Sequence, residues 1–348
     1  MGPRCAIVIL AACGRIGFTP IDQLGTTGTP VNLAFVTSSM QAAADFGGLA
    51  GGDAVCATRA AAAGLPGTYR AWLSTSTIDA IDRLAGARGW RRIDGTPVAD
   101  LPSDLIDGRM LSAIRLDETG ADVGDLTAIV TGTYSDGTAL ETCSDYTDPS
   151  ANVTTGTASA SDGWWTNVDT LGCATPAPLY CFGIDLDVPL GVSPATGRLA
   201  FVSTAKFTPS SGLAAADETC ASEAAAAGLA GEFLALLPAS GPAEGRFDPT
   251  GPPWIRVDGL PLAPSADAFF AGNTRTPLDV AATGGHIVDY VLTGGAPNDA
   301  PDPTLDCAGW TSSSGNSVYG FSAESGVEAF NNTTAGCATA QPVYCLAR

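Results

Sequence analysis

The spacing of the cysteines restricts the fold of this chain more than any other feature. Eight of the ten cysteines form two sets with the same gaps of 87, 30 and 8 residues, and the second set follows the first by 164 residues (220 − 56). The sets are Cys56, Cys143, Cys173 and Cys181, then Cys220, Cys307, Cys337 and Cys345. An even number of cysteines at repeated spacings indicates disulfides, which persist in oxidising compartments. The sequence therefore predicts two copies of one disulfide-stapled domain, and the spacing leaves three pairings open in each set.

Other segments recur at a similar offset and delimit the two copies. LAFVT (33–37) matches LAFVS (199–203), and CATPAPLYCF (173–182) matches CATAQPVYCL (337–346). The predicted organisation is copy 1 at residues 32–186, a linker at 187–196 and copy 2 at 197–348. Two units are too few for a stacked repeat protein, so we expect two separate domains.

The N-terminus has the pattern of a secretion signal. Arg4 precedes a short apolar stretch that ends in Leu10-Ala11-Ala12-Cys13-Gly14, which resembles a bacterial lipobox. On this interpretation residues 1–13 form the signal and its lipobox, Cys13 carries the lipid, and residues 14–31 are a tether. The prediction is an exported bacterial lipoprotein at the outer membrane or cell surface that contacts the membrane through its lipid alone. An ordinary buried N-terminal strand is the alternative.

Local patterns predict several helices and strands. Asp53 is expected to cap a helix that stops at Gly64, with a counterpart from Asp217 to Gly228, and the first cysteine of each set is expected on the first helical turn. A second helix is expected over residues 74–86 of copy 1, because apolar residues recur there three positions apart. The corresponding part of copy 2 is too rich in proline for such a helix. Alternating residues at 179–184 and 343–347 predict closing strands.

One segment of copy 1 carries a family resemblance. CATRAAAAGLPGTYRAWLSTS, from Cys56 to Ser76, resembles a segment of endostatin, the C-terminal domain of certain collagens, and the SDGT segment at Ser135–Thr138 continues the likeness. The chain is similar also to a bacterial family of domains on secreted proteins that groups with endostatin in the C-type-lectin-like superfamily. The resemblance covers both copies. It implies an α+β fold of two tandem C-type-lectin-like domains, each a twisted antiparallel sheet with one or two helices and long disulfide-stapled loops.

The resemblance also implies a cysteine pairing, first with fourth and second with third. The implied bridges are Cys56–Cys181, Cys143–Cys173, Cys220–Cys345 and Cys307–Cys337.

Sugar-binding members of this superfamily use calcium to bridge sugar hydroxyls and protein carboxylates. The resemblance therefore makes calcium the cofactor to consider. Candidate oxygen ligands lie before the second and third cysteines of copy 2, at Asn298, Asp299, Asn331 and Asn332. However, Ala296 stands where the first carboxylate would be, and neither copy has a complete ligand set. Ordinary turn-forming residues are therefore the favoured interpretation, and no metal or other cofactor is assigned.

The charged residues favour no polyanionic partner. The net charge of −20 disfavours attraction to nucleic acid. Arginines gather in copy 1, but aspartates are interleaved with them, which indicates a salt-bridged surface; these arginines are Arg83, Arg88, Arg91 and Arg92. Four acidic residues nearby predict a solvated loop; they are Asp117, Glu118, Asp122 and Asp125.

Aromatic residues offer the best candidate contact with a ligand. Trp164 and Trp165 are adjacent, so at most one can point inward if they lie on a strand. The other could stack on a sugar ring or on a partner side chain, with Asn167 and Asp169 beside it. Packing of both rings between loop and core is the alternative.

Catalytic signals are weak. His286 is the only histidine, which leaves histidine-dependent nucleophilic catalysis without support. The predicted function is thus non-catalytic binding of an extracellular protein or glycan, of unstated identity. The alternatives are a structural envelope protein without a discrete ligand and a hydrolase that uses a carboxylate pair.

Overall fold

The computed structural model describes residues 30–348, and Val31–Arg348 forms one compact unit. The predicted signal, the lipidation site Cys13 and nearly all of the tether lie outside the described residues. Within them, no helix is both long and apolar enough to cross a membrane. The described chain is mixed α+β, with small, mostly antiparallel sheets, few helices and four disulfides.

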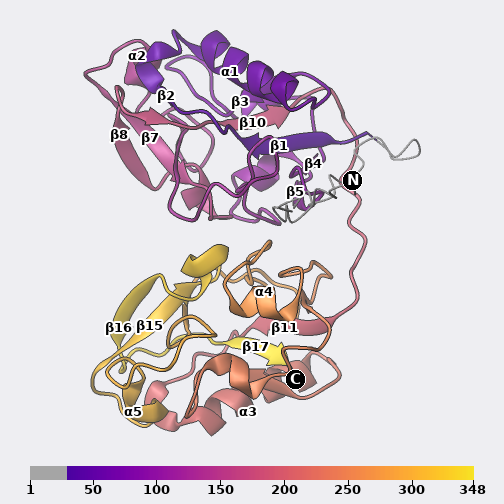
Figure 1. Ribbon diagram of the computed structural model, residues 1–348, viewed down its shortest axis with the longest axis vertical. Coiled ribbons are helices and arrows are strands. Elements are labelled where there is room, and N and C mark those ends of the chain that lie inside the picture. The colour runs from indigo at the N-terminus through magenta and orange to yellow at the C-terminus, as the bar shows by residue number, and fades with distance from the viewer. Residues whose placement is uncertain (1–29) are drawn as a thin grey trace, which may run out of the picture. The chain divides into compact units, whose positions relative to one another are not determined.

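Copy 1 is built on a five-stranded sheet (Figure 1). Its strand order is β3 (Tyr69–Ala71), β10 (Tyr180–Gly183), β1 (Asn32–Val36), β4 (Trp90–Arg91) and β5 (Pro97–Ala99). The β1–β4 pair is parallel and the other pairs are antiparallel. Helix α1 (Leu49–Ala62) packs against β3 and β10.

Smaller elements complete copy 1. A three-stranded antiparallel sheet has the order β6 (Ala128–Val130), β7 (Asn152–Thr157) and β8 (Asp169–Gly172), and a two-stranded sheet pairs β2 (Gln41–Ala42) with β9 (Pro176–Ala177). The short helical segments are α2 (Cys143–Tyr146) and the 3₁₀ turns η1 (Ala43–Asp45), η2 (Asp82–Leu84), η3 (Pro102–Leu105) and η4 (Gly163–Trp165).

Copy 2 repeats this plan. Its main sheet has the order β12 (Phe233–Ala235), β17 (Tyr344–Ala347), β11 (Arg198–Val202) and β13 (Trp254–Arg256), and its smaller sheet is β14 (Tyr290–Leu292), β15 (Asn316–Phe321) and β16 (Thr333–Gly336). Its helical segments are α3 (Leu213–Ala226), α4 (Ala266–Phe270), α5 (Cys307–Trp310), η5 (Pro209–Ser211), η6 (Ala243–Arg246) and η7 (Gly326–Ala329). The duplicated sequence therefore has a duplicated set of elements.

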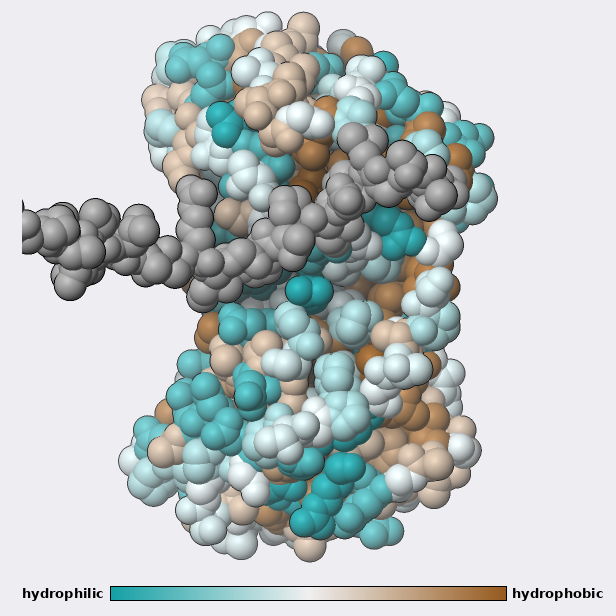
Figure 2. Space-filling view, turned by 45° about the vertical axis from the view of Figure 1, so that its right-hand side comes forward, coloured by the Kyte–Doolittle hydropathy of each residue, from teal (hydrophilic) through white to brown (hydrophobic). Residues whose placement is uncertain are grey.

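Each copy buries its own apolar core. Two hydrophobic clusters of buried residues belong to copy 1 and two to copy 2, each made from one copy's residues in the part of the chain that the structure describes. Trp72, Trp90 and Trp254 are 0–1% exposed, at the centres of these clusters. On the surface, hydrophobic residues are interspersed with hydrophilic ones on the face that Figure 2 shows.

The four disulfides join the cysteines that the resemblance implied. They are Cys56–Cys181, Cys143–Cys173, Cys220–Cys345 and Cys307–Cys337. In each copy the first bridge ties the long helix to the closing strand, β10 or β17, and closes a separation of 125 residues. The closing strands were predicted from their alternating residues, and this prediction is confirmed.

The start of the long helix differs from the prediction. Helix α1 begins at Leu49 after Gly48, whose φ of 103° suits glycine, and Cys56 therefore lies in mid-helix instead of on the first turn. Asp53 does not cap the helix; its carboxylate accepts a hydrogen bond from the Ala71 amide (2.9 Å) and pairs with Arg83 (2.6 Å). The predicted stop is correct, since Gly64 follows the helix with φ of 70°.

Copy 2 has the same arrangement. Asp217 accepts from the Ala235 amide (3.0 Å) and pairs with Arg246 (2.6 Å). Both aspartates thus connect a helix, a strand and an arginine, and this tertiary role replaces the predicted cap.

The helix expected over residues 74–86 does not form. The segment holds only a Thr75–Ile78 bridge and the turn η2. Its apolar residues are placed individually, with Leu84 buried and Ile78 46% exposed. Copy 2 has the corresponding turn η6, so the predicted difference between the copies is also wrong.

The second cysteine of each copy lies in a left-handed turn. All four residues of α2 have φ between 52° and 64°, as do the four of α5, at 53–64°. This conformation costs L-residues roughly 1–2 kcal/mol each. Its recurrence in both copies shows that the bridge and the surrounding contacts hold it.

A candidate ligand pocket where the two copies meet

One contact between the two copies joins an equivalent segment from each. Ala160 and Glu324 form an antiparallel bridge. On either side, the Ser161 amide donates to the Ala323 carbonyl (2.9 Å) and the Ser325 amide donates to the Ser159 carbonyl (2.9 Å). The hydroxyls of both serines repeat these two bonds, at 2.9 and 3.0 Å.

This contact is related to the duplication of the sequence. Glu324 follows Ala160 by 164 residues, the offset of the cysteines. If each residue is replaced by its counterpart in the other copy, the hydrogen bond from Ser161 to Ala323 becomes the one from Ser325 to Ser159, and the reverse. The contact is thus a pseudo-two-fold one, of the self-complementary kind found in symmetric dimers.

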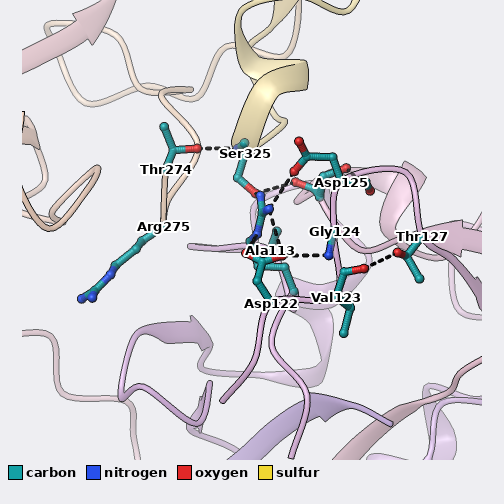
Figure 3. Close-up of polar contacts among 12 residues, drawn as sticks. Ala113, Asp122, Val123, Gly124, Asp125, Thr127, Thr274, Arg275 and Ser325 are labelled. Carbon is teal, nitrogen blue, oxygen red and sulfur yellow. Dashed lines mark hydrogen bonds and ion pairs between the residues drawn. The ribbon is translucent and has the colours of Figure 1, made fainter. Parts of the chain in front are cut away.

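Asp122 and Asp125 of copy 1 lie beside Ser325 of copy 2 at the same junction (Figure 3), where Arg115 binds all three. Its guanidinium donates to Asp122 (2.8 Å), to Asp125 (2.7 Å) and to the Ser325 hydroxyl (3.1 Å). The other oxygen of Asp125 accepts from the Val327 amide (2.9 Å). The acidic stretch predicted as a solvated loop is thus an ordered part of the junction at Asp122 and Asp125.

A pocket of about 290 Å³ opens beside this contact. Sheet β6-β7-β8 and the turn η4 of copy 1 form one wall, and the segment from Glu324 to Asn332 of copy 2 forms the other. The lining residues are Leu126, Ala128, Thr155, Gly156, Thr157, Trp164, Val168 and Asp169 of copy 1, with Glu324, Glu328 and Asn332 of copy 2.

Two buried polar atoms in this lining have no hydrogen-bond partner. They are Oε2 of Glu324 and Oγ1 of Thr155. Glu324 is 2% exposed and Thr155 is fully buried. Buried polar atoms are nearly always paired, because leaving one unpaired costs about 1–3 kcal/mol. Two such atoms from different copies in one pocket mark a place where a ligand could supply the missing partners.

The carboxyl groups around the pocket hold protons unusually well. Burial, with the charges of Asp162, Glu328 and Asp125, raises the pKa of Glu324 to about 8, although a hydrogen bond with Ser159 opposes the rise. Burial also raises the pKa of Asp162 to about 6, and it raises that of Glu328. The raised pKa favours the protonated form of Glu324 near neutral pH, and in that form its carboxyl group can donate a hydrogen bond.

The junction beside the pocket is not fully symmetric. Trp164 stacks on Phe321, with ring centroids 4.6 Å apart and an interplanar angle of 13°. Their counterparts at the 164-residue offset are Glu328 and Thr157. Trp164 lines the pocket together with these two counterparts, Glu328 and Thr157.

The structure brings together some of the predicted ligand contacts. Trp164 and Asp169 line the pocket, but Trp164 lies in η4 instead of a strand. Trp165 is 1% exposed, and its indole N–H donates to the Leu105 carbonyl (2.8 Å), so it belongs to the core. Asn167 is half-buried and is not among the lining residues.

The candidate calcium ligands do not come together. Asn298, Asp299 and Asn331 are exposed, whereas Asn332 lines the pocket and donates to Glu328 (2.8 Å). Within residues 30–348, no group of three or more acidic, histidine or cysteine side chains is placed to hold a metal ion.

Several charged residues predicted at the surface are buried. Asp117 and Glu118 are 7% and 2% exposed, and Glu118 binds Arg59 and the Ser38 amide (2.8 Å). The arginine cluster is ion-paired as predicted for three members, in the pairs Arg83–Asp53, Arg88–Asp100 and Arg92–Asp94. Arg83 and Arg92 are nevertheless buried, since their guanidinium groups also bind backbone carbonyls. Arg91 binds the carbonyls of Gly95 and Gly191.

The single histidine has a structural partner. His286 lies 3.0 Å from Asp279, which also binds the buried Arg256.

A larger hollow of about 440 Å³ lies along α1 beside Arg59. We favour the smaller pocket, because the guanidinium of Arg59 is already bound by Glu118 and Ser38.

Sequence reasoning missed Glu324, Glu328 and Thr155. The one available signal was the offset itself, which puts Glu324 and Glu328 where copy 1 has alanine and tryptophan. Comparison of the chain with protein-family models and with curated proteins finds no match. The endostatin likeness therefore depends on the quoted segments alone.

Proposed function

We propose that this chain is a non-catalytic binding protein that recognises an extracellular protein or glycan through the pocket between its copies. The observation that carries the proposal is the pair of unpartnered buried atoms, Glu324 Oε2 and Thr155 Oγ1, in a pocket also lined by Trp164. Concave sites with apolar walls and a few converging polar groups are typical of ligand binding.

The architecture behind this proposal is a tandem pair of C-type-lectin-like, endostatin-like domains. The nested disulfides and the matching sheet orders of the two copies support it. The boundaries at 32–186, 187–196 and 197–348 belong to the same proposal.

Export as a lipoprotein is proposed with it. Four disulfides fit an oxidising compartment. Radiolabelled palmitate should enter the wild-type chain in a bacterial host and not the Cys13→Ser variant. Labelling of both would discard the lipid anchor.

The binding function is tested on glycan and protein arrays, with calcium and with a chelator. Hits should weaken in Asp169→Asn, since Asp169 is an exposed lining residue, and a thermal melt checks that this variant is folded. The matched control is Asp82→Asn, an exposed aspartate outside the pocket. Silence under both conditions would favour the structural envelope protein.

A carboxylate-pair hydrolase is the second candidate, because Glu324, Glu328 and Asp169 line one pocket. A carboxyl with a raised pKa is what a general acid needs at neutral pH. A panel of aryl glycosides separates the two functions. Turnover that Glu324→Gln abolishes would establish the hydrolase, and no turnover is expected of a binding protein.

A further inference from the structure

We propose that the pocket binds the alkylammonium end of a lysine side chain on a partner protein. This inference rests on the binding function proposed above and names the chemistry of its ligand. Three features of the pocket carry it: the sign of its charges, the unpartnered oxygen of Glu324 and its apolar rim.

The charges in the pocket all have one sign. Its charged lining residues, among those that the structure describes, are the carboxyl groups of Asp169, Glu324 and Glu328. Arg115 is a cation of the junction, and Asp122, Asp125 and Ser325 occupy its guanidinium. A cationic ligand would therefore meet carboxylates that no arginine or lysine of the pocket neutralises.

Glu324 supplies a deep acceptor. Its Oε2 atom is buried and unpartnered, and an ammonium group has three donors. Thr155 Oγ1 is a second unpartnered acceptor in the same lining. The two acceptors come from different copies.

The rim suits the methylene stem of lysine. Leu126 is 77% exposed and Val168 is 45% exposed, and both line the pocket with Ala128 and Trp164. Lysine packs its methylenes on apolar surface while its charged end finds polar partners. A sugar would need polar partners around its whole ring, and this rim offers few.

Other ligand classes fit less well. An anion would meet the acidic side chains of Asp169 and Glu328 and no cation in the pocket lining. A bare metal ion would need several oxygen ligands, and no group of three acidic side chains is placed for one within residues 30–348.

Binding should be linked to proton release. Glu324 must lose its proton to pair with an ammonium ion, and the proton leaves to solvent. Several ionisable groups around Glu324 influence this step; they are Asp125, Asp162, Glu328, Tyr180 on β10 and Tyr344 on β17. Arg115 also lies close, through its bond to Ser325. Affinity should therefore rise between pH 6 and pH 8.5.

The test is calorimetric titration of the full chain with two matched probes at pH 8. Nα-acetyl-lysine methylamide carries the ammonium, and Nα-acetyl-norleucine methylamide has a similar stem without it. The lysine probe should bind at least about tenfold more tightly, because its ammonium group can form charge-assisted hydrogen bonds that norleucine cannot form. Equal binding of both probes would overturn the inference.

Variants locate the site. Asp169→Asn and Glu324→Gln should each weaken the lysine probe several-fold, and Asp82→Asn should not. Thermal melts check that Glu324→Gln remains folded, and the exposed Asp169 provides the test if it does not. An unchanged affinity in both pocket variants would contradict the assignment.

The outcomes also separate this inference from the function on which it rests. Array hits on neutral glycans without lysine binding would overturn the ligand and keep the binding function. Tighter binding of glucosamine than of the lysine probe would overturn the assignment to a protein side chain. Silence in both experiments would remove both proposals.

Discussion

Ala160 and Glu324 lie opposite each other in the antiparallel bridge that joins the two copies, and they are equivalent residues of the duplicated sequence. The same backbone segment thus binds its own counterpart. At this position copy 1 has the methyl side chain of Ala160, and copy 2 has the carboxyl side chain of Glu324. That difference gives the junction its buried acid.

The buried acid makes stability depend on pH. The pKa of Glu324 is raised from 4.5 to about 8 in the folded chain. Between these values the folded state holds a proton that the unfolded state has lost, so the free energy of unfolding falls as pH rises, by up to about 1.4 kcal/mol per pH unit. Glu324→Gln should remove this slope. Urea denaturation at pH 6, 7 and 8 measures it.

The control for this experiment is Glu218→Gln, a change at an exposed glutamate of α3. Its pH dependence should match that of the wild type. If Glu324→Gln keeps the wild-type dependence of the free energy of unfolding on pH, other ionisable groups must cause that dependence.

A buried ion pair should matter far more than an exposed one. Arg256 pairs with Asp279 at 2.5 Å, with side chains 0% and 1% exposed. Arg256→Met would leave Asp279 buried without its main partner, and the loss should be about 3–5 kcal/mol. Arg109→Met, at a side chain 61% exposed, should lose less than about 1 kcal/mol. The denaturant midpoints of the two variants measure these losses of stability. Similar losses in both variants would contradict the expected effect of burial.

The left-handed turn of copy 2 offers a stabilising change. Ala308 has φ of 55° and is exposed, so Ala308→Gly should relieve backbone strain and raise stability by about 0.5–1 kcal/mol. Gly309→Ala, at φ of 64°, should lower it. Thermal melts of the two variants should move in opposite directions. Shifts in the same direction would exclude this account of the turn.

The sequence predicted the features that repeat or alternate along the chain. The disulfide pattern, the closing strands and the end of α1 at Gly64 follow from spacing, resemblance and local backbone preference. The helix start was misjudged because Asp53 bonds to a strand and to Arg83, 30 residues away in sequence. The false helix at 74–86 shows that threefold apolar spacing also occurs in irregular segments whose side chains enter the core singly.

The pocket was beyond local reasoning for a different reason. Asp169 and Trp164 were found because an aromatic pair is visible in the sequence. Thr155 lies opposite Asp169 in the β7–β8 pair of copy 1, and Glu328 joins them only through the contact between the copies. The sequence shows which residues are equivalent and does not show that equivalent segments pair with each other.

The central claim is that these equivalent segments pair about Ala160 and Glu324. Residues directly opposite in such a non-hydrogen-bonded antiparallel pair have Cα atoms about 4.5 Å apart, which a disulfide can span. The double variant Ala160→Cys/Glu324→Cys, oxidised and digested without reduction, should therefore yield a fifth bridge by mass spectrometry, between peptides of copy 1 and copy 2. Two free thiols in a protein that keeps its four native bridges would contradict the pairing and the pocket built on it.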